Sequence, residues 1–406
     1  MDLGTCLHSL PRLGTPIQWG IGGAASLALF CKTMRLGKLL LSLLSLLACA
    51  FAAPRTETGD INGAKFRIDV PENWNGGLVM YCHGYNPKPV SYDNPKLAPA
   101  LAVFLDAGYA LAQSGYAAGG WAIQEALTDT ESLRRYFVSK YGAVKETYVT
   151  GHSMGGFLTM AIMETQPAVY DAGLPLCGPL SAPLTFVSRG AFDGRVLFDY
   201  YFPGLLPDPT HVDKNYDPGK EITEKVQAAL DAAPAKAEIL RRQTNIKNNK
   251  DLAGVLTFVT YVVKEIQERA GGNPFDNRNV IYTGTGDDPA VNAAVKRYAA
   301  DPKAVAYLRN YYTPTGRIAK PMLAVHTVYD PLVPASIPNT YTGLTEQAGS
   351  AANFVQQYVN HDGHCTILPN EIARAFSELR EWKTSGVRPI GGELKTPAQA
   401  AQSAGR

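Results

Sequence analysis

Short apolar runs alternate with amphipathic segments along most of the chain after about residue 55. Short apolar runs predict buried strands, and longer segments with apolar residues three or four positions apart predict helices. We expect strands at residues 65–70, 78–82, 109–114, 146–150, 173–177, 322–328 and 354–359. We expect helices around them at residues 95–107, 122–141, 155–165, 336–348 and 369–383. This alternation predicts an α/β fold, with a mostly parallel central sheet flanked by helices on both faces.

The alternation stops between residues 180 and 319. That block opens with aromatic and proline-rich loops. Its helical periodicities lie at residues 220–231, 236–246, 250–269, 289–299 and 302–311. It predicts a mainly helical cap inserted into one sheet domain, whose two parts are residues 53–179 and 320–385. The aromatic residues at its start favour the cap's own core over a substrate pocket; they are Phe198, Tyr200, Tyr201 and Phe202. The Gly-, Pro- and Ala-rich segment 386–406 is expected to be a disordered tail.

The first 52 residues have the pattern of a targeting segment. From Met34 the chain has a basic start, an apolar stretch that ends near Leu47, and an A-x-A-like site at residues 50–52. The apolar stretch is short for a membrane span. We therefore expect a cleaved signal peptide, with translation starting at Met34, and a secreted or periplasmic protein. Two alternatives stay open, which are a lipoprotein anchored through Cys49 and an apolar N-terminal helix of the fold.

Three cysteines follow the targeting segment: Cys82, Cys177 and Cys365. An exported protein can form disulfides, but an odd number leaves at least one thiol unpaired. The sequence leaves the pairing open. No C-x-x-C motif or metal-type spacing is present, so cysteine chemistry is not expected to carry a reaction.

The strongest local signal is the run Gly151-His152-Ser153-Met154-Gly155-Gly156 between the strand at 146–150 and the helix at 155–165. A G-x-S-x-G motif in this context predicts a sharp strand-to-helix turn that exposes the serine hydroxyl at the edge of the sheet. Ser153 is therefore the candidate nucleophile. The Met154 N–H, at the start of the helix, is a candidate donor to a reacting carbonyl oxygen.

On these residues the chain resembles the α/β-hydrolase superfamily, over roughly residues 64–178 and 320–383. The resemblance is to a secreted carboxylesterase-like member with a helical cap insertion. It implies the chain order nucleophile, acid, histidine, with Asp330 after the strand at 322–328 and His364 after the strand at 354–359. Asp362 and His361 are the alternatives for the acid and the base. The resemblance also implies that the His83-Gly84-Tyr85 run supplies the second oxyanion donor, the Tyr85 N–H.

Other candidate residues have weaker support. Trp121 is a candidate for the substrate pocket and could equally fill the core. His83 is also a pocket candidate, but its imidazole is expected to support the oxyanion loop rather than to take part in the chemistry. His152 is expected to pack under the turn, and His326 to be a core residue. The H-D-G-H run at 361–364 lacks the spacing and further ligands of a metal site, so no metal is expected.

The chain has 38 basic and 36 acidic residues, so it lacks the excess of positive charge that is typical of proteins that bind nucleic acid. The expected function is serine hydrolysis of small-molecule or polymeric carboxylic esters through an acyl-enzyme, without a cofactor. The alternatives are an exported serine peptidase, prolyl-oligopeptidase-like or aminopeptidase-like, and a non-catalytic binding module. Such a module usually lacks a member of the triad, whereas this chain has all three. Chain length of the acyl group and oligomeric state are not predicted.

Overall fold

The structure is a computed structural model that describes residues 55–94 and 96–394. The predicted signal peptide, Cys49 and residues 395–406 lie outside the described residues. The described chain forms one sheet, in the order β1-β2-β4-β3-β5-β6-β7-β8-β9. β1 pairs with β2, and β2 with β4, in antiparallel fashion, and all other pairs are parallel. The predicted α/β fold class is therefore confirmed.

The strands are β1 (Arg55–Ile61), β2 (Ala64–Val70), β3 (Gly77–Cys82), β4 (Ala110–Ser114), β5 (Glu146–His152), β6 (Ala172–Leu176), β7 (Met322–Tyr329), β8 (Phe354–Asp362) and β9 (Gly392–Glu393). The central strands are nearly continuous runs of buried residues, as in the sequence GLVMYC of β3. Strands buried on both faces lose the alternation of apolar and polar residues that marks a one-sided sheet.

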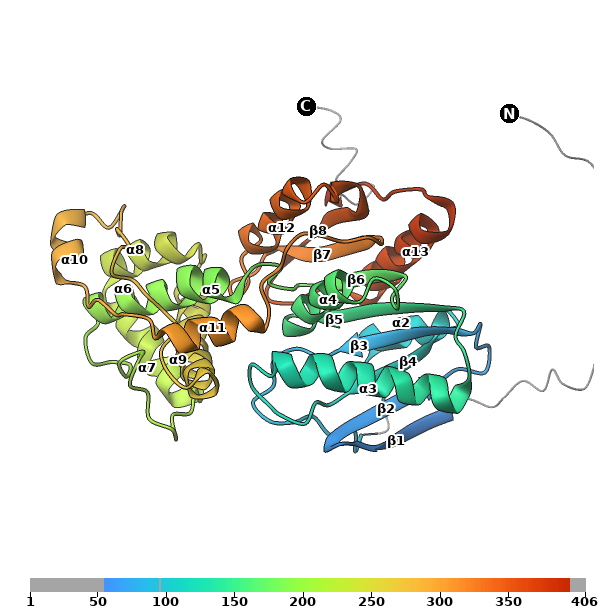
Figure 1. The fold of residues 1–406 in the computed structure, drawn as a ribbon. Coiled ribbons are helices and arrows are strands. Elements are labelled where there is room, and N and C mark those ends of the chain that lie inside the picture. Colours follow the sequence, from blue (N-terminus) through green and yellow to red (C-terminus); the bar gives the residue numbers. More distant parts are fainter. Residues whose placement is uncertain (1–54, 95, 395–406) are drawn as a thin grey trace, which may run out of the picture. The chain divides into compact units, whose positions relative to one another are not determined.

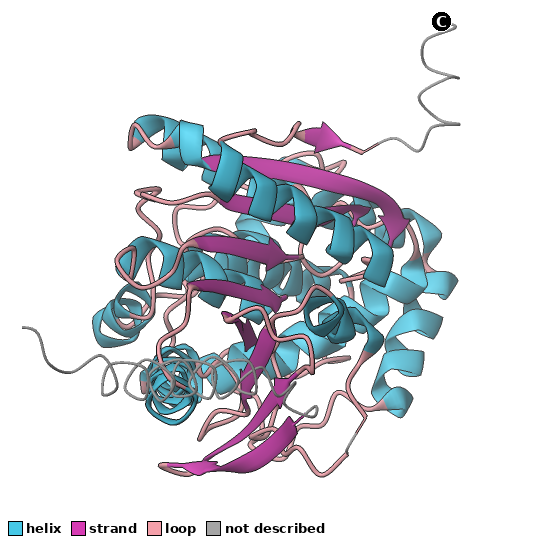
Figure 2. Ribbon diagram, turned by 90° about the vertical axis from the view of Figure 1, so that its right-hand side faces the viewer, coloured by secondary structure: helices cyan, strands magenta, loops and turns pink. Residues whose placement is uncertain are grey.

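Helices cover both faces of the sheet (Figures 1 and 2). One face packs against α3 (Ile123–Tyr141), α4 (Met154–Thr165) and α12 (Ser336–Gln347). The other packs against α2 (Pro99–Asp106) and α13 (Pro369–Ser385), through residues such as Phe104 and Phe376. Two apolar layers thus hold the strands rigidly, and the loops at their carboxyl ends are free to carry chemistry.

A block of helices is inserted between β6 and β7, where the sequence predicts it, and Figure 1 shows it grouped beside the sheet domain. We call this block the cap. Its elements are α5 (Pro183–Phe186), η1 (Val187–Phe192), α6 (Asp193–Tyr201), α7 (Lys220–Ala232), α8 (Pro234–Thr244), α9 (Asn249–Ala270), α10 (Asp288–Ala294) and α11 (Pro302–Asn310). Phe198 is fully buried and stacks on Phe202, as expected for residues of the cap's own core.

Two parts of the fold differ from the prediction. β1 was not predicted, because its sequence RTETGDI is polar and most of its residues are exposed or half-buried at the sheet edge. A tight turn at Asn62-Gly63, both with positive φ, folds it onto β2. The prediction of a disordered tail is wrong for Gly392–Glu393, which form β9 and pair with β8. The segment before β9 is also held against β8: Arg388 donates to the Phe354 carbonyl oxygen, and the Gln357 side chain donates to the Ile390 carbonyl oxygen.

Smaller differences concern helix ends. The helix predicted at 289–299 ends at Ala294, where Val295 turns to an extended conformation. The helix predicted at 95–107 begins at Pro99, since a proline suits the first turn of a helix better than its interior. No helix in the described ranges combines the length and apolar character needed to cross a membrane.

Candidate active site

The predicted turn is present at the end of β5. Ser153 has φ 57° and ψ −121°, a strained combination for a residue with a side chain. The flanking glycines make the turn possible. A Cβ on Gly151 would lie 2.4 Å from the Cys82 carbonyl oxygen, and a Cβ on Gly155 only 1.9 Å from the same atom. Any side chain at either position would push the turn away from β3, which explains both glycines of the motif.

The structure brings Ser153, His364 and Asp330 together. His364 Nε2 lies 2.8 Å from Ser153 Oγ, and His364 Nδ1 lies 2.7 Å from Asp330 Oδ2. A carboxylate can only accept, so Nδ1 carries the proton and Nε2 is free to accept the serine hydroxyl proton. The three residues follow β5, β7 and β8, which end at the same edge of the sheet.

The Asp330 carboxylate is fixed by hydrogen bonds at both of its oxygens. Its side chain is buried, and its Oδ1 accepts hydrogen bonds from the backbone N–H groups of Leu332 and Val333 at 2.9 and 2.8 Å. His326 lies in β7, four residues before Asp330. Its Nε2 is 2.8 Å from the Val333 carbonyl oxygen, so the ring supports the same loop. Burial lowers the pKa of His326, which keeps its ring neutral beside the acid.

The alternative acid and base point elsewhere. Asp362 forms an ion pair with Lys247 of the cap at 2.8 Å, and both side chains are more than half exposed. His361 Nε2 lies 3.0 Å from Glu371 Oε1. Among the described residues, neither Asp362 nor His361 forms a hydrogen bond with Ser153, whereas His364 does.

Two backbone N–H groups are placed to bind an oxyanion. Met154 is the first residue of α4, directly after Ser153. The Gly84-Tyr85 segment lies against the turn: a Cβ on Gly84 would be 3.3 Å from Ser153 Cβ and 3.2 Å from the His152 carbonyl oxygen. In the described part of the chain, neither the Tyr85 nor the Met154 N–H has a backbone hydrogen-bond partner. Both are therefore available to a substrate oxygen.

A cavity of about 270 Å³ opens over Ser153, beneath the cap. Its wall includes His364, Tyr85, the Pro331–Pro334 loop and one face of α9. The α9 residues in this wall are spaced three or four apart, as on one side of a helix; they are Leu252, Val255, Leu256, Val259 and Val262, with Phe258 beside them. No Asp, Glu, Lys or Arg is among the described residues that line the cavity.

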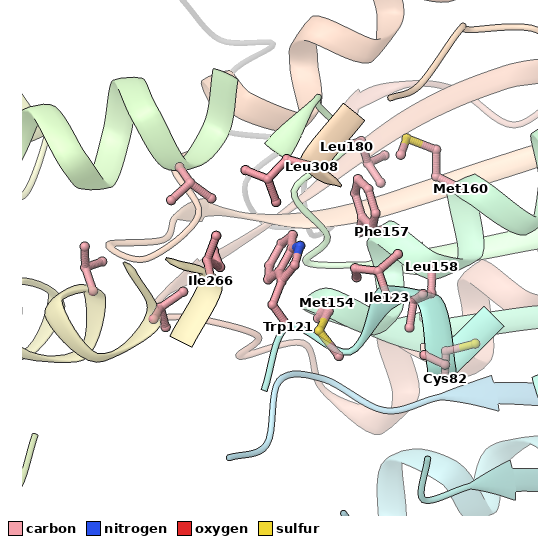
Figure 3. Close-up of a cluster of buried hydrophobic side chains, with 14 of the residues drawn as sticks. Cys82, Trp121, Ile123, Met154, Phe157, Leu158, Met160, Leu180, Ile266 and Leu308 are labelled. Atoms are coloured by element: carbon pink, nitrogen blue, oxygen red, sulfur yellow. The ribbon is translucent and has the colours of Figure 1, made fainter. Parts of the chain in front are cut away.

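Trp121 lies both in the cavity wall and in the core. It is 4% exposed and belongs to the buried cluster in Figure 3, where Ile266 of α9 and Leu308 of α11 lie close to it. Its backbone N–H donates to Glu265 of α9 at 2.6 Å, and Glu265 in turn accepts from Arg269. This link fixes the loop before α3 to the cap.

His83, a pocket candidate whose imidazole was expected to support the loop, is not among the described residues that line the cavity. The His83 ring stacks on Tyr116 with centroids 3.9 Å apart, and its Nδ1 lies 2.6 Å from the Gly84 carbonyl oxygen. It supports the oxyanion loop from behind, and burial lowers its pKa. His152 also plays a supporting part. Its Nδ1 lies 3.1 Å from the Tyr81 hydroxyl, and burial, together with the nearby His364, lowers its pKa to about 4.

Two features of the site were not predicted. One is a disulfide between Cys177 and Cys365, which leaves Cys82 as a buried thiol among the described cysteines. The other is the α9 face that walls the cavity. A signal existed for each: Cys177 ends a predicted strand and Cys365 follows the predicted base, while the α9 sequence has an apolar stripe of helical period.

Four observations identify the fold: the order of the strands, the serine turn after β5, the acid after β7 and the histidine after β8. The chain has the α/β-hydrolase fold. No protein-family model matches the sequence. No curated protein matches it either.

Solved structures with similar folds include hydrolases of two kinds. The Pyrococcus horikoshii acylaminoacyl peptidase aligns with 84% of this chain at 12% identity and a TM-score of 0.43, and the chain spans only 43% of that protein. The Pyrococcus furiosus esterase Pf2001 aligns with 81% of this chain at 12% identity and a TM-score of 0.43, over 90% of its own length. Est1E from Butyrivibrio proteoclasticus aligns with 81% at 13% identity and a TM-score of 0.43, over 99% of its length.

Proposed function

We propose that this α/β-hydrolase-fold protein is a serine hydrolase that cleaves carboxylic esters with an apolar acyl or alcohol group. The observation that carries the proposal is the continuous chain of contacts from Asp330 through His364 to Ser153, which opens into an apolar cavity. A serine hydroxyl needs such a base to attack a carbonyl at neutral pH.

The geometry supports a two-step reaction. Ser153 Oγ bonds to the carbonyl carbon while its proton passes to His364 Nε2. The oxyanion is stabilised by the N–H groups of Tyr85 and Met154. His364 then protonates the leaving alkoxide, and an acyl-enzyme remains on Ser153. Water attacks this ester, its proton passes through His364, and the carboxylic acid leaves.

The cavity favours esters over substrates with a free amino terminus. An aminopeptidase needs a carboxylate to pair with the substrate's ammonium group, because a buried unpaired charge is costly. The described lining has none. The cavity of about 270 Å³ is apolar along the α9 wall and has room for more than an acetyl group. We therefore expect acyl chains of medium length.

The experiment is hydrolysis of p-nitrophenyl esters from acetate to dodecanoate, with aminoacyl-nitroanilides as the peptidase comparison. Ester turnover by the wild type that is lost in Ser153→Ala is the expected result. Hydrolysis of the anilides, with esters untouched, would instead assign a peptidase. Absence of both activities in a folded protein would favour a binding role.

We further propose that the protein acts outside the cytoplasm after removal of residues 1–52. The Cys177–Cys365 disulfide supports this, because such bonds persist mainly in oxidising compartments. N-terminal sequencing of protein recovered from outside the cytoplasm should begin at Ala53. A lipid-labelled product beginning at Cys49 would assign the lipoprotein alternative.

A further inference from the structure

The disulfide lies beside the proposed base. Cys365 directly follows His364, and its Sγ lies 3.5 Å from His364 Nε2, the nitrogen that faces Ser153. Cys177 directly follows β6, 188 residues earlier in the chain. The bond therefore joins the histidine loop to the end of the strand next to the one that carries the nucleophile.

The Cys177 end of the bond is anchored to the serine turn. The carbonyl oxygen of Leu176, the preceding residue, accepts a hydrogen bond from the Ser153 N–H at 2.9 Å. The Cys177 N–H donates to Val325 of β7 at 2.8 Å, and Cys177 itself is fully buried. The next residue, Gly178, packs so tightly on α4 that a Cβ there would lie 2.8 Å from the Gly156 carbonyl carbon. This point can hardly move relative to Ser153.

The His364 ring is held by Asp330, but the backbone anchors of its loop lie at Gly363, one residue before the histidine. The Gly363 N–H donates to the Tyr329 carbonyl oxygen at 2.8 Å, and the Thr327 hydroxyl donates to the Gly363 carbonyl oxygen at 3.1 Å. Gly363 and Cys365, on either side of the histidine, both have positive φ, so no regular backbone ladder holds the residue between them. The nearby Asp362–Lys247 pair is largely exposed and holds the loop only weakly.

We propose that the Cys177–Cys365 disulfide is a positioning element that sets the distance between His364 Nε2 and Ser153 Oγ, and so sustains the turnover rate. A short path of one hydrogen bond and one covalent bridge connects the nucleophile's backbone to the base: Ser153, Leu176, Cys177, Cys365, His364. The proposal rests on the proposed function of Ser153 and His364 as nucleophile and base. The expected loss of rate can be estimated, because a misplacement of about 1 Å at a reacting centre can lower the rate about 100-fold.

The first test compares the wild type with Cys177→Ala/Cys365→Ala, and with Cys82→Ala as the matched control that keeps the disulfide. Well below the unfolding temperature, we expect kcat of the double variant to fall by about 10- to 100-fold. KM should change much less than kcat, since Cys365 is the only one of the two cysteines in the described cavity wall and the α9 face is untouched. The Cys82 variant should keep the wild-type kcat. A double variant with wild-type kcat and only a lower melting temperature would overturn the proposal.

A second test uses the wild-type protein and so does not depend on the folding of a cysteine variant. Dithiothreitol reduces the bond in the folded wild type by two thiol–disulfide exchanges: its two thiols become a cyclic disulfide, and the protein gains two thiols. Cys365 lines the cavity, which gives a small reductant access. With far-UV circular dichroism unchanged, kcat should fall on reduction and recover on reoxidation. Unchanged turnover of the fully reduced, folded enzyme would overturn the proposal.

The rate at which a fluorophosphonate labels Ser153 separates this proposal from the proposed function. This labelling depends on activation of the serine by the histidine and requires no ester substrate. Slower labelling after loss of the disulfide supports the positioning role even if no ester is turned over. Equal labelling rates with and without the bond, in a protein that does hydrolyse esters, would overturn the positioning role alone.

Discussion

Asp330 Oδ2 lies 2.7 Å from His364 Nδ1, while the other oxygen of the same carboxylate accepts two backbone N–H groups from its own loop. The carboxylate cannot rotate without losing these bonds, so it holds the imidazole in one tautomer. The loop thereby orients the base before any substrate arrives.

Replacing this acid should remove most of the turnover. Asp330→Asn keeps the size of the side chain but can donate to His364 Nδ1, which favours the wrong tautomer. We expect kcat for p-nitrophenyl esters to fall by about 10⁴-fold, with little change in melting temperature. Asp362→Asn is the matched control, since Asp362 pairs with exposed Lys247, and it should retain wild-type turnover. Equal losses in the two variants would contradict the assignment of the acid.

The serine turn should not tolerate a single added methyl group at Gly155. A Cβ there would lie 1.9 Å from the Cys82 carbonyl oxygen, so Gly155→Ala must displace the turn or β3. We expect a folded but inactive enzyme or a large fall in the free energy of unfolding. The matched control is Gly254→Ala in α9, where no atom lies within 4 Å of the added group. That variant should be stabilised by about 0.5–1 kcal/mol in chemical denaturation.

The α9 face should set the acyl chain length. Val259 is 6% exposed and lines the cavity, so Val259→Trp should fill part of it. We expect kcat/KM for p-nitrophenyl decanoate to fall about tenfold or more, because that chain needs the lost volume, while the acetate value stays near wild type. The bulkier side chain should also cost about 1–3 kcal/mol of stability. Equal losses for acetate and decanoate would show that this face does not hold the chain.

Buried histidines should make the fold sensitive to mild acid. Burial lowers the pKa values of His83, His152 and His326 below their ordinary value of 6.5, to about 4 for His152. Below pH 6.5 the unfolded chain therefore binds protons that the folded chain refuses, and the free energy of unfolding falls as the pH drops toward 4. Each such histidine contributes at most about 1.4 kcal/mol per pH unit.

Denaturant unfolding between pH 5 and pH 8 measures this effect. The free energy of unfolding should be nearly constant above pH 7 and decline below about 6.5. His326→Asn lacks one titrating ring, so its decline should be shallower, whatever its stability at pH 8. An identical slope in the variant would show that His326 does not contribute to the acid sensitivity.

The parts of the site that could be predicted depend on local sequence. Ser153, Asp330 and His364 each follow a strand that is recognisable by its own apolar run, and parallel strands bring their carboxyl ends to one edge. The prediction failed where the structure depends on partners far away in the chain. The pairing of Cys177 with Cys365 depends on two segments 188 residues apart, and the sequence offered three cysteines for one bond.

The edges of the sheet were harder to predict for a different reason. β1 buries little, so its polar sequence carries no strand pattern, although Asn62-Gly63 is a strong hairpin signal that could have revealed it. Likewise, the apolar stripe on α9 predicted a buried face but not what would cover it. That face forms part of the wall of a cavity rather than packing entirely against protein, which only the three-dimensional arrangement shows.

The cap lies wholly within the segment that the Cys177–Cys365 bond closes into a ring, because the chain leaves β6 at Cys177 and returns to β7 and β8 before Cys365. The ring encloses α5 through α11. A protease that cuts a cap loop once would therefore leave the piece with Ser153 and the piece with His364 covalently joined. Such a nicked enzyme would migrate as one band on a non-reducing gel and as two after reduction, and its two halves could not diffuse apart.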